Sequence, residues 1–376
     1  MKDIAVVGAG HIGGTVAALL AQTGDYRVTV IDRSAEQLAE LGPISGVEHL
    51  VLEVTDEKAL AAALNGKFAV LSAAPYHLTF EVAKAAKAAG AHYLDLTEDV
   101  ATTRKVKQLA HGATTAFIPQ CGLAPGFISI AAADLIKGFD TLHDVRLRVG
   151  ALPKYPSNAL NYNLTWSTDG VINEYCEPCE AIVDGLPRQT RALEECEAFS
   201  LDGVTYEAFN TSGGLGTLCE TLAGKVRNLN YRTIRYPGHA AIMKALLNDL
   251  RLRDRRDMLK DILENAVPAT MQDVVIVFVT VSGMKGGHLV QQTYAHKIYA
   301  QEMAGRSLSA IQITTAASLC AVLDLLVAGK LPAKGFVRQE EIALADFLGN
   351  RFGRVYASAD AEPKPVIRPV SLESAA

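Results

Sequence analysis

Three glycines and one aspartate near the N-terminus have the spacing of a dinucleotide-binding turn. Gly8, Gly10 and Gly13 lie between an apolar run and a helix-like run, and Asp32 ends the next apolar run. Gly8 permits a tight turn, Gly10 lets the backbone approach a pyrophosphate, and Gly13 lets the helix pack closely on the strand. Free N–H groups at the helix start then bind the negative phosphates. A purely structural glycine turn is the alternative, but the whole pattern favours a nicotinamide cofactor and hydride transfer.

The residue that ends the second apolar run selects the form of the cofactor. Asp32 can accept a hydrogen bond from a ribose 2′-OH and would repel a 2′-phosphate, which favours NAD. Arg33 follows it and could pair with that phosphate, so NADP stays an alternative. The remaining expected cofactor contacts lie at the helix start and at later strand tips: His11, Ile12, Ala73, Ala74, Gly122 and Pro125.

Four other side chains stand where chemistry is expected. Tyr76 and His77 follow the apolar run 68–72, in a loop near the expected nicotinamide, and either could act in proton transfer or pack beneath the cofactor. Asp95 lies near the end of the run 92–96; its structural alternatives are a strand-end turn or a cap for the helix near residue 101. His239 has a side chain whose ordinary pKa suits a general base, although a lone histidine is more often structural.

The elements that must position these residues alternate between strand and helix. Strand-like runs at 4–7, 28–31, 50–54, 68–72, 92–96 and 115–118 are separated by helical segments. This alternation predicts an α/β, Rossmann-type doubly wound parallel sheet over residues 1–126. Ligands of such sheets bind beyond the carboxyl ends of the strands, so the tips after 72, 94 and 118 are expected to carry the chemistry.

The pattern changes in the second half of the chain. Runs 145–152, 160–166, 181–183 and 226–235, with a hairpin at 274–299, predict an inserted, largely antiparallel α+β domain for substrate and oligomerisation over 127–305. Helices at 310–327 and 339–352 suggest that residues 306–356 return to the first domain. The composition of 357–376 predicts a disordered tail.

Bulk properties exclude several classes of protein. The chain has 376 residues, 49% of them hydrophobic, and a formal net charge of −5 without a basic stripe, so a nucleic-acid partner is not expected. No uninterrupted apolar run of about 18 residues and no signal-peptide pattern occur, so we expect a cytoplasmic protein without membrane partners. Cys176 and Cys179 form a single CxxC without a second pair at zinc spacing. Two ordinary thiols are the favoured interpretation, over a zinc or redox role, and no metal is expected.

Six strings in this order resemble the saccharopine dehydrogenase/reductase superfamily. They are residues 6–10, 93–97, 121–126, 160–167, 209–214 and 231–239. The resemblance covers nearly the whole chain and is closest to the lysine 6-dehydrogenase branch. It implies a Rossmann domain closed by the C-terminal segment, a substrate domain between, and NAD(P)-linked oxidation of a carbon that bears an amine. For lysine, the imine product hydrolyses to 2-aminoadipate 6-semialdehyde and ammonia.

The resemblance also assigns expected substrate contacts. Saccharopine reductases that resemble this chain carry an arginine at the position of Asp169; an acid there can hold an ammonium but not the carboxylates of a glutamate arm. Asp95 matches the family's substrate-contacting aspartate, and Arg235, beside Arg232, suits an α-carboxylate. Tyr76, Thr211 and Ser212 are expected on the substrate side, and Trp166 in the core or as a pocket wall.

Several alternatives remain open at this stage. A saccharopine or carboxynorspermidine-type dehydrogenase, acting on a secondary amine, is the second enzyme hypothesis. A non-catalytic dinucleotide sensor is the hypothesis from another class. A homo-oligomer, dimer or higher, is expected because the long edges of the hairpin at 274–299 could pair between subunits.

Overall fold

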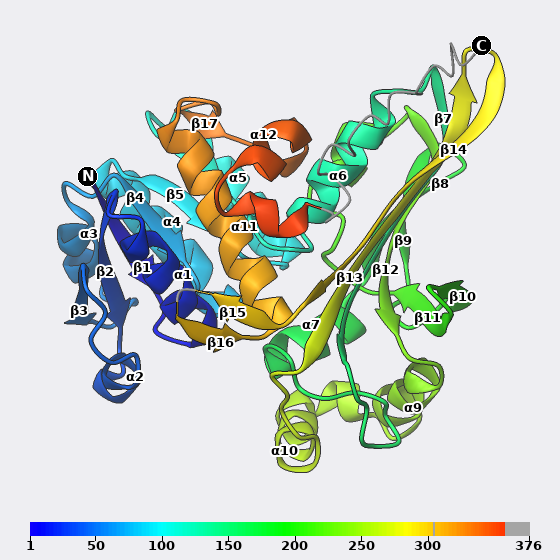
Figure 1. The fold of residues 1–376 in the computed structure, drawn as a ribbon, viewed down its shortest axis with the longest axis horizontal. Helices are drawn as coiled ribbons and strands as arrows, with labels where there is room; N and C mark the ends of the chain where they lie inside the picture. The colour runs from blue at the N-terminus through cyan, green and yellow to red at the C-terminus, as the bar shows by residue number, and fades with distance from the viewer. Residues whose placement is uncertain (304, 358–376) are drawn as a thin grey trace, which may run out of the picture.

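Two β-sheets organise the protein, and each belongs to a different part of the chain. The computed structural model describes residues 1–303 and 305–357. The N-terminal sheet lies on the left of Figure 1 and the second sheet on the right, with helix α11 (Ala310–Val327) between them.

The first sheet has seven parallel strands in the order β17-β6-β5-β4-β1-β2-β3. The order in which the strands are added reverses at β1, so the tips of β1 and β4 flank the switch point where such sheets bind ligands. This confirms the predicted doubly wound sheet. The elements are β1 (Lys2–Val7), α1 (His11–Gln22), β2 (Tyr26–Asp32), α2 (Ala35–Glu40), β3 (Val47–Val51), α3 (Glu57–Leu64), β4 (Ala69–Ser72), α4 (Tyr76–Ala89), β5 (His92–Asp95), α5 (Val100–Ala110), β6 (Ala116–Ile118) and β17 (Gly335–Phe336).

The second sheet is mixed, which confirms the predicted α+β architecture. Its main path is β10-β11-β12-β7-β13-β14, with β8 beside β12 and β9 beside β8. Only β7 and β12 pair in parallel. The strands are β7 (Thr141–Pro153), β8 (Cys179–Val183), β9 (Leu186–Thr190), β10 (Glu197–Leu201), β11 (Val204–Asn210), β12 (Val226–Arg235), β13 (Asp273–Lys285) and β14 (His288–Tyr299).

Helices and short turns complete the second half. They are α6 (Phe127–Ile136), α7 (Thr168–Cys176), α8 (Leu218–Leu222), α9 (His239–Lys244), α10 (Arg256–Ala266), α11 and α12 (Leu344–Gly349), with the small ribbon β15 (Gln301–Met303) and β16 (Arg306–Leu308). A short π-helix (Ala245–Asp249) extends α9, and 3₁₀ helices lie at Leu252–Asp254, Gln339–Glu341 and Gly353–Tyr356.

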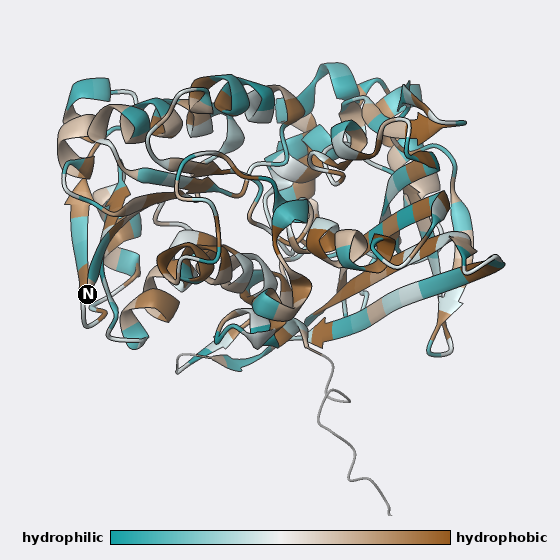
Figure 2. Ribbon diagram, turned by 90° about the horizontal axis from the view of Figure 1, so that it is seen from above, coloured by the Kyte–Doolittle hydropathy of each residue, from teal (hydrophilic) through white to brown (hydrophobic). Residues whose placement is uncertain are grey.

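Helix α11 joins the two halves through the hydrophobic core. It packs against α1 and against β13, and its N-terminus is fixed by a capping box between Ser309 and Gln312. Hydrophobic residues lie along this helix and along the inner strands, with hydrophilic residues toward the outer helices (Figure 2). In the described chain, α11 is the one helix long and apolar enough to cross a membrane, but 83% of it is buried inside the fold, so it is weak support for a membrane span. Polar residues such as Asp324 interrupt its apolar run.

Three predicted elements differ from those observed. The expected strand at 160–166 is irregular chain with a single bridge, because Asn158 hydrogen-bonds the backbone of Tyr162 and Asn161 adopts φ 49°. The expected helix at 339–352 is broken into a 3₁₀ turn and α12. The expected third strand at 50–54 begins and ends earlier, as β3.

The loop prediction for Tyr76 and His77 is also wrong. Both residues form the first turn of α4, which begins directly after Pro75. Proline fixes φ near the helical value and needs no amide partner at a helix start. The predicted tail lies outside the described residues, except for Ala357.

Candidate functional site

The turn between β1 and α1 has the shape of a phosphate cradle. Gly8 has φ +107°, and a Cβ there would lie 2.8 Å from the Ala73 oxygen. At Gly13 a Cβ would lie 1.9 Å from the Gly8 oxygen, so the helix packs directly on the turn. A Cβ at Gly10 would meet no protein atom within 4 Å, and Gly10 begins α1 without a side-chain cap. The open face and the uncapped helix start, which includes exposed His11 and half-buried Ile12, therefore fit a dinucleotide pyrophosphate.

The carboxylate at the tip of β2 is fixed by backbone amides. Asp32 accepts hydrogen bonds from Ala9 N and Ser34 N, each at 2.8 Å. Each oxygen keeps a further lone pair for a ribose hydroxyl. Arg33 is exposed and forms no ion pair with the described residues. The geometry is thus compatible with the free 2′-OH of NAD and with the 2′-phosphate of NADP.

The expected cofactor contacts beyond α1 lie at neighbouring strand tips. Ala73 and Ala74 follow β4 and are half-buried beside the glycine turn. Gly122 and Pro125 form a buried turn between β6 and α6, and Ser318 of α11 donates a hydrogen bond to the Gly122 oxygen at 2.9 Å. This turn is therefore held rigidly against both the sheet and α11.

The carboxylate of Asp95 is fully buried at the tip of β5. It accepts hydrogen bonds from Tyr93 Oη at 2.7 Å, Thr97 N at 3.0 Å and Gln120 N at 2.8 Å. Burial raises the pKa of Asp95 to about 6, while these hydrogen bonds oppose the rise. Asp95 joins the tips of β5 and β6. The N-cap of α5 is instead Asp99, which corrects the alternative that Asp95 caps this helix.

A buried hydrogen-bonded chain lies on the substrate side. Arg235, at the end of β12, donates from Nε to Tyr175 Oη at 3.0 Å, and its Nη1 donates to the backbone oxygens of Ala151 and Ile234. Tyr175 Oη lies 3.0 Å from His239 Nε2, and His239 Nδ1 lies 2.9 Å from the Leu160 oxygen. The consistent assignment is a neutral His239 that donates from Nδ1 and accepts at Nε2.

Burial and the nearby Arg235 charge lower the pKa of His239 to about 3. With both ring nitrogens engaged, His239 is placed to orient Tyr175 and Arg235. Nη2 of Arg235 has no acceptor among the described residues, so this 98% buried guanidinium keeps one free edge. A free guanidinium edge is suited to a carboxylate.

Two glutamates that the sequence analysis did not assign lie beside this chain. Glu174 is on α7, 5% exposed, and Glu98 follows β5 on the other side of the domain interface. The two domains touch here, because a Cβ at Gly213 would lie 2.5 Å from the backbone oxygen of Glu98. Within the second domain, Ser212 N donates a hydrogen bond to the backbone oxygen of Glu174 at 3.0 Å. Glu98 could have been proposed from the sequence, because it lies three residues after Asp95, close to a predicted strand tip. Glu174 could not, because helix α7 was not predicted.

Asp169 and Tyr76 stand further out, near the rim. Asp169 is exposed in the first turn of α7 and pairs with Lys260 at 2.7 Å. Tyr76 is half-buried; burial and the Asp99 carboxylate raise its pKa, and Asp169 contributes in the same direction. Asp169 therefore lies within electrostatic range of Tyr76, across the domain interface, while His77 beside Tyr76 is exposed.

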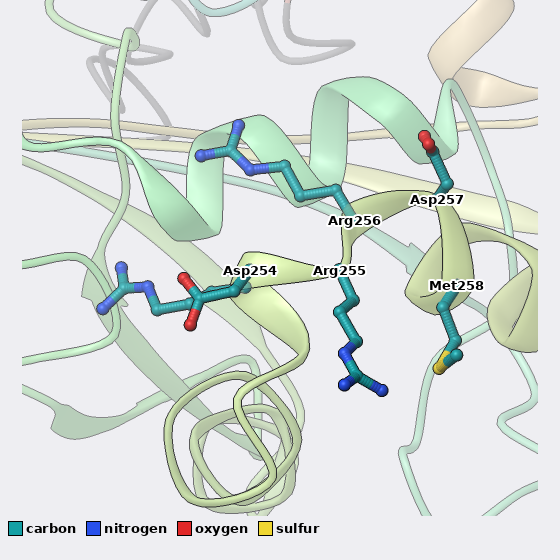
Figure 3. Close-up of a pocket in the computed structure, with 6 residues that line it drawn as sticks. Asp254, Arg255, Arg256, Asp257 and Met258 are labelled. Carbon is teal, nitrogen blue, oxygen red and sulfur yellow. The ribbon is translucent and has the colours of Figure 1, made fainter.

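A hollow at the start of α10 adjoins this rim. It is lined by residues 253–258, and Figure 3 shows Arg255 and Arg256 pointing away from each other. Arg256 is paired with Glu177 at 2.6 Å, and its charge lowers the pKa of Tyr76. The hollow is thus a charged margin of the site.

The remaining predicted residues are engaged within the protein. Thr211 Oγ1 lies 2.7 Å from Thr233 Oγ1, and Ser212 Oγ donates to the Pro178 oxygen at 2.9 Å. Trp166 packs over Gly170 of α7, where a Cβ would lie 2.4 Å from its ring. The structure therefore brings Thr211, Ser212 and Arg235 to the wall of the second domain that also carries Glu174, close to Glu98 of the first domain.

No metal site emerges from the described residues. They contain no group of three or more His, Cys, Asp or Glu side chains that could hold an ion. All six cysteines are free thiols, including Cys176 and Cys179. Burial raises the pKa of both, which disfavours the thiolates that metal binding requires.

Comparison with known proteins places these features in context. Residues 4–117 match the model of the saccharopine dehydrogenase NADP binding domain, and residues 122–350 match the saccharopine dehydrogenase C-terminal domain. Saccharopine dehydrogenase [NADP(+), L-glutamate-forming] of Saccharomyces cerevisiae is 25% identical over 67% of this chain and 59% of its own length. Mitochondrial alpha-aminoadipic semialdehyde synthase of Mus musculus is 24% identical over 49% of this chain, which spans 21% of that protein.

A solved structure shares the fold. Apo saccharopine dehydrogenase (L-Glu forming) from Saccharomyces cerevisiae superposes with a TM-score of 0.78, covering 93% of this chain and 97% of that one, at 18% identity. The two-sheet arrangement described above is therefore common to both proteins.

Proposed function

Because the chain belongs to the saccharopine dehydrogenase family, we propose that it is an NAD-dependent dehydrogenase that oxidises the ε-carbon of L-lysine. The family membership supports a dinucleotide cofactor and an amino-acid substrate. The choice of lysine rests on the charges that line the candidate site.

The observation that carries this choice is an excess of carboxyl groups. One guanidinium, Arg235, has a free edge for a carboxylate, whereas two carboxyl groups without an ion pair in the described chain, Glu98 and Glu174, lie in the same region. Lysine offers one carboxylate and two ammonium groups, which matches this balance. Saccharopine carries two further carboxylates, and Arg256 and Lys260 are already paired with acids. The walls therefore favour a monocarboxylic diamine.

The chemistry follows from this placement. Arg235 holds the α-carboxylate, and acidic groups receive the ε-ammonium and take one of its protons. A nicotinamide held by the β1–α1 turn would supply the acceptor for the hydride that leaves the ε-carbon. The C–H bond breaks as a C=N bond forms, and water then replaces ammonia to give the semialdehyde. Lysine, NAD⁺ and water thus become semialdehyde, ammonium, NADH and one proton.

The proposed cofactor form is NAD. Asp32 places a carboxylate at the end of β2, held by two amides, where a ribose 2′-OH would donate to it. A 2′-phosphate at this point would meet that negative charge. Exposed Arg33 is the feature that supports NADP instead, as the family model's description also does.

A second candidate is oxidation of a secondary amine such as saccharopine. It is favoured by the names of the relatives, which are saccharopine dehydrogenase and alpha-aminoadipic semialdehyde synthase. Binding of saccharopine requires at least one more unpaired Arg or Lys side chain for its extra carboxylates than the site provides.

A spectrophotometric assay of NADH formation separates the candidates. Purified protein is incubated with NAD or NADP and with L-lysine, saccharopine or L-leucine as an amine control. We expect NADH formation with lysine and NAD, with a kcat/KM at least about tenfold above that for saccharopine, equivalent to one lost charge-assisted contact. Turnover of saccharopine alone would reject the proposal, and no turnover of any amine would favour a binding protein.

A further inference from the structure

Two carboxyl groups, those of Glu174 and Glu98, belong to opposite sides of the domain interface and have no hydrogen bond or ion pair to another residue of the described chain. Glu174 is 5% exposed, yet its carboxylate forms no hydrogen bond or ion pair within the described residues. Glu98 is half-buried and forms no ion pair there either. Neither carboxyl is completely sealed from solvent. The Tyr162 hydroxyl, by contrast, is fully buried and has no hydrogen-bond partner among the described residues. Buried carboxyls are normally paired, so both are available to a ligand.

The contacts around the pair bring both domains into one site. The backbone of Glu174 is tied to Ser212, and the next residue, Gly213, packs against the backbone of Glu98. Gly213 has φ +88° and leaves only 2.5 Å for a Cβ, so this approach needs glycine. The two glutamates are therefore positioned by the same close contact.

The titration behaviour of the pair is consistent with their proximity. Burial raises the pKa of Glu98 to about 7; the residue's own backbone amide opposes the rise, and the Asp99 and Asp95 carboxylates add to it. Burial raises the pKa of Glu174 well above its ordinary range; the Glu98 charge adds to this, and Arg235 opposes it. The charge of Glu174 also contributes to the raised pKa of three tyrosines, which are Tyr162, Tyr175 and Tyr231.

A second, independent feature points to a ligand at this place. Arg235 is 2% exposed and keeps a free Nη2, and its charge acts on Glu174, but the two side chains form no ion pair. A buried cation and a buried anion that interact without pairing are suited to a zwitterionic molecule between them.

We propose that Glu98 and Glu174, one from each domain, together receive the side-chain ammonium of the substrate and accept the proton that it loses before oxidation. This assignment rests on the proposed amine oxidation for its reaction. The N–H bond breaks toward a glutamate oxygen, and the nitrogen lone pair then forms the C=N bond as the hydride departs. Asp95 keeps its positioning role at the strand tips.

Infrared difference spectroscopy tests the pair without cofactor or turnover. At about pH 6, below the raised pKa of Glu98, the wild-type protein is expected to show a carboxylic-acid C=O band that disappears when lysine binds. Glu98→Gln and Glu174→Gln are expected to lose this lysine-dependent change. Glu180→Gln is the matched control, because Glu180 lies at the same interface but is paired with Arg104 at 2.5 Å. An unchanged lysine-dependent band in both test variants overturns the assignment.

Kinetics on the amine that the wild type oxidises give the second readout. We expect Glu174→Gln to lower kcat about 100-fold and to remove the acidic limb of the kcat/KM pH profile, with Glu174→Asp recovering part of both. Glu98→Gln is expected to raise the KM for the amine about tenfold. Circular dichroism and cofactor fluorescence titration show whether each variant is folded and binds dinucleotide.

The two proposals fail in different ways. Wild-type protein inactive on lysine but active on saccharopine rejects the proposed substrate, and the variants are then compared on saccharopine. Wild-type activity on lysine with an unchanged pH profile in Glu98→Gln and Glu174→Gln rejects the glutamate pair alone.

Discussion

At the scale of single residues, burial decides which candidate side chains can exchange protons. His239 has both ring nitrogens in protein hydrogen bonds and Asp95 accepts three, whereas the carboxyls of Glu98 and Glu174 have no hydrogen bond to another described residue. A group whose hydrogen-bonding capacity is mostly used by the protein orients its neighbours, and a group without partners can serve a ligand. The sequence suggested His239 and Asp95 because of their residue types and positions, but residue type does not reveal hydrogen-bond saturation.

His239 offers a pH-dependent test of this distinction. Its pKa falls from 6.5 to about 3 on folding, so the unfolded chain binds the proton more tightly between these values. The stabilisation from neutral His239 is complete above about pH 6.5 and is lost as pH falls through the window, at about 1.4 kcal/mol per pH unit.

Urea unfolding of wild type and His239→Gln between about pH 5 and pH 7.5 measures this slope. We expect the free energy of unfolding to fall more steeply with acid in the wild type than in the variant. His111→Gln is a control at the exposed end of α5 and should keep the wild-type slope. Equal slopes in wild type and His239→Gln would show that His239 titrates normally in the folded protein.

At the scale of elements, two glycines of the β1–α1 turn are expected to serve different purposes, one in cofactor binding and the other in folding. Gly10 has φ −68° and open space at its Cβ position, so Gly10→Ala should fold normally while its methyl group obstructs the pyrophosphate. Gly13→Ala would place its Cβ 1.9 Å from the Gly8 oxygen and should destabilise the domain by several kcal/mol, about 2–4.

Calorimetric NADH titration and thermal unfolding of the two variants check this contrast. Gly10→Ala is expected to keep the wild-type melting temperature with at least about tenfold weaker cofactor binding, whereas Gly13→Ala melts earlier. Gly349→Ala, at an exposed position of α12 with open space for a Cβ and no positive φ, serves as a control for a glycine away from the site. Unimpaired NADH binding by Gly10→Ala would remove this turn from the cofactor site.

Sequence reasoning succeeded for elements whose signals are local. The glycine turn, the parallel sheet and the β13–β14 hairpin follow from glycine positions and apolar periodicity, which act within a few residues. Helix α7 depends on distant contacts: Ser212 N donates a hydrogen bond to the Glu174 backbone oxygen, and the Glu174 side chain is buried. A glutamate within a polar segment predicts an exposed surface, so its burial could not be read from the sequence.

At the scale of the whole molecule, the second sheet has a long free edge. β14 pairs only with β13 in the described chain, and its exposed apolar side chains include Leu289, 70% exposed, and Tyr299, 49% exposed. Unpaired edges of this length tend to be covered. The expected homo-oligomer therefore becomes a specific proposal, in which β14 pairs with β14 of a second copy.

Light scattering coupled to size-exclusion chromatography tests this arrangement. We expect the mass of a dimer or larger assembly for the wild type, and dissociation in the double variant Leu289→Lys/Tyr299→Lys, because lysines on paired edges repel each other. Val51→Lys is the matched control: Val51 is 57% exposed on β3, the edge strand of the first sheet, and its charge should leave the assembly intact. Dissociation by Val51→Lys alone would move the interface to the other sheet, and a monomeric wild type would show that β14 remains uncovered in solution.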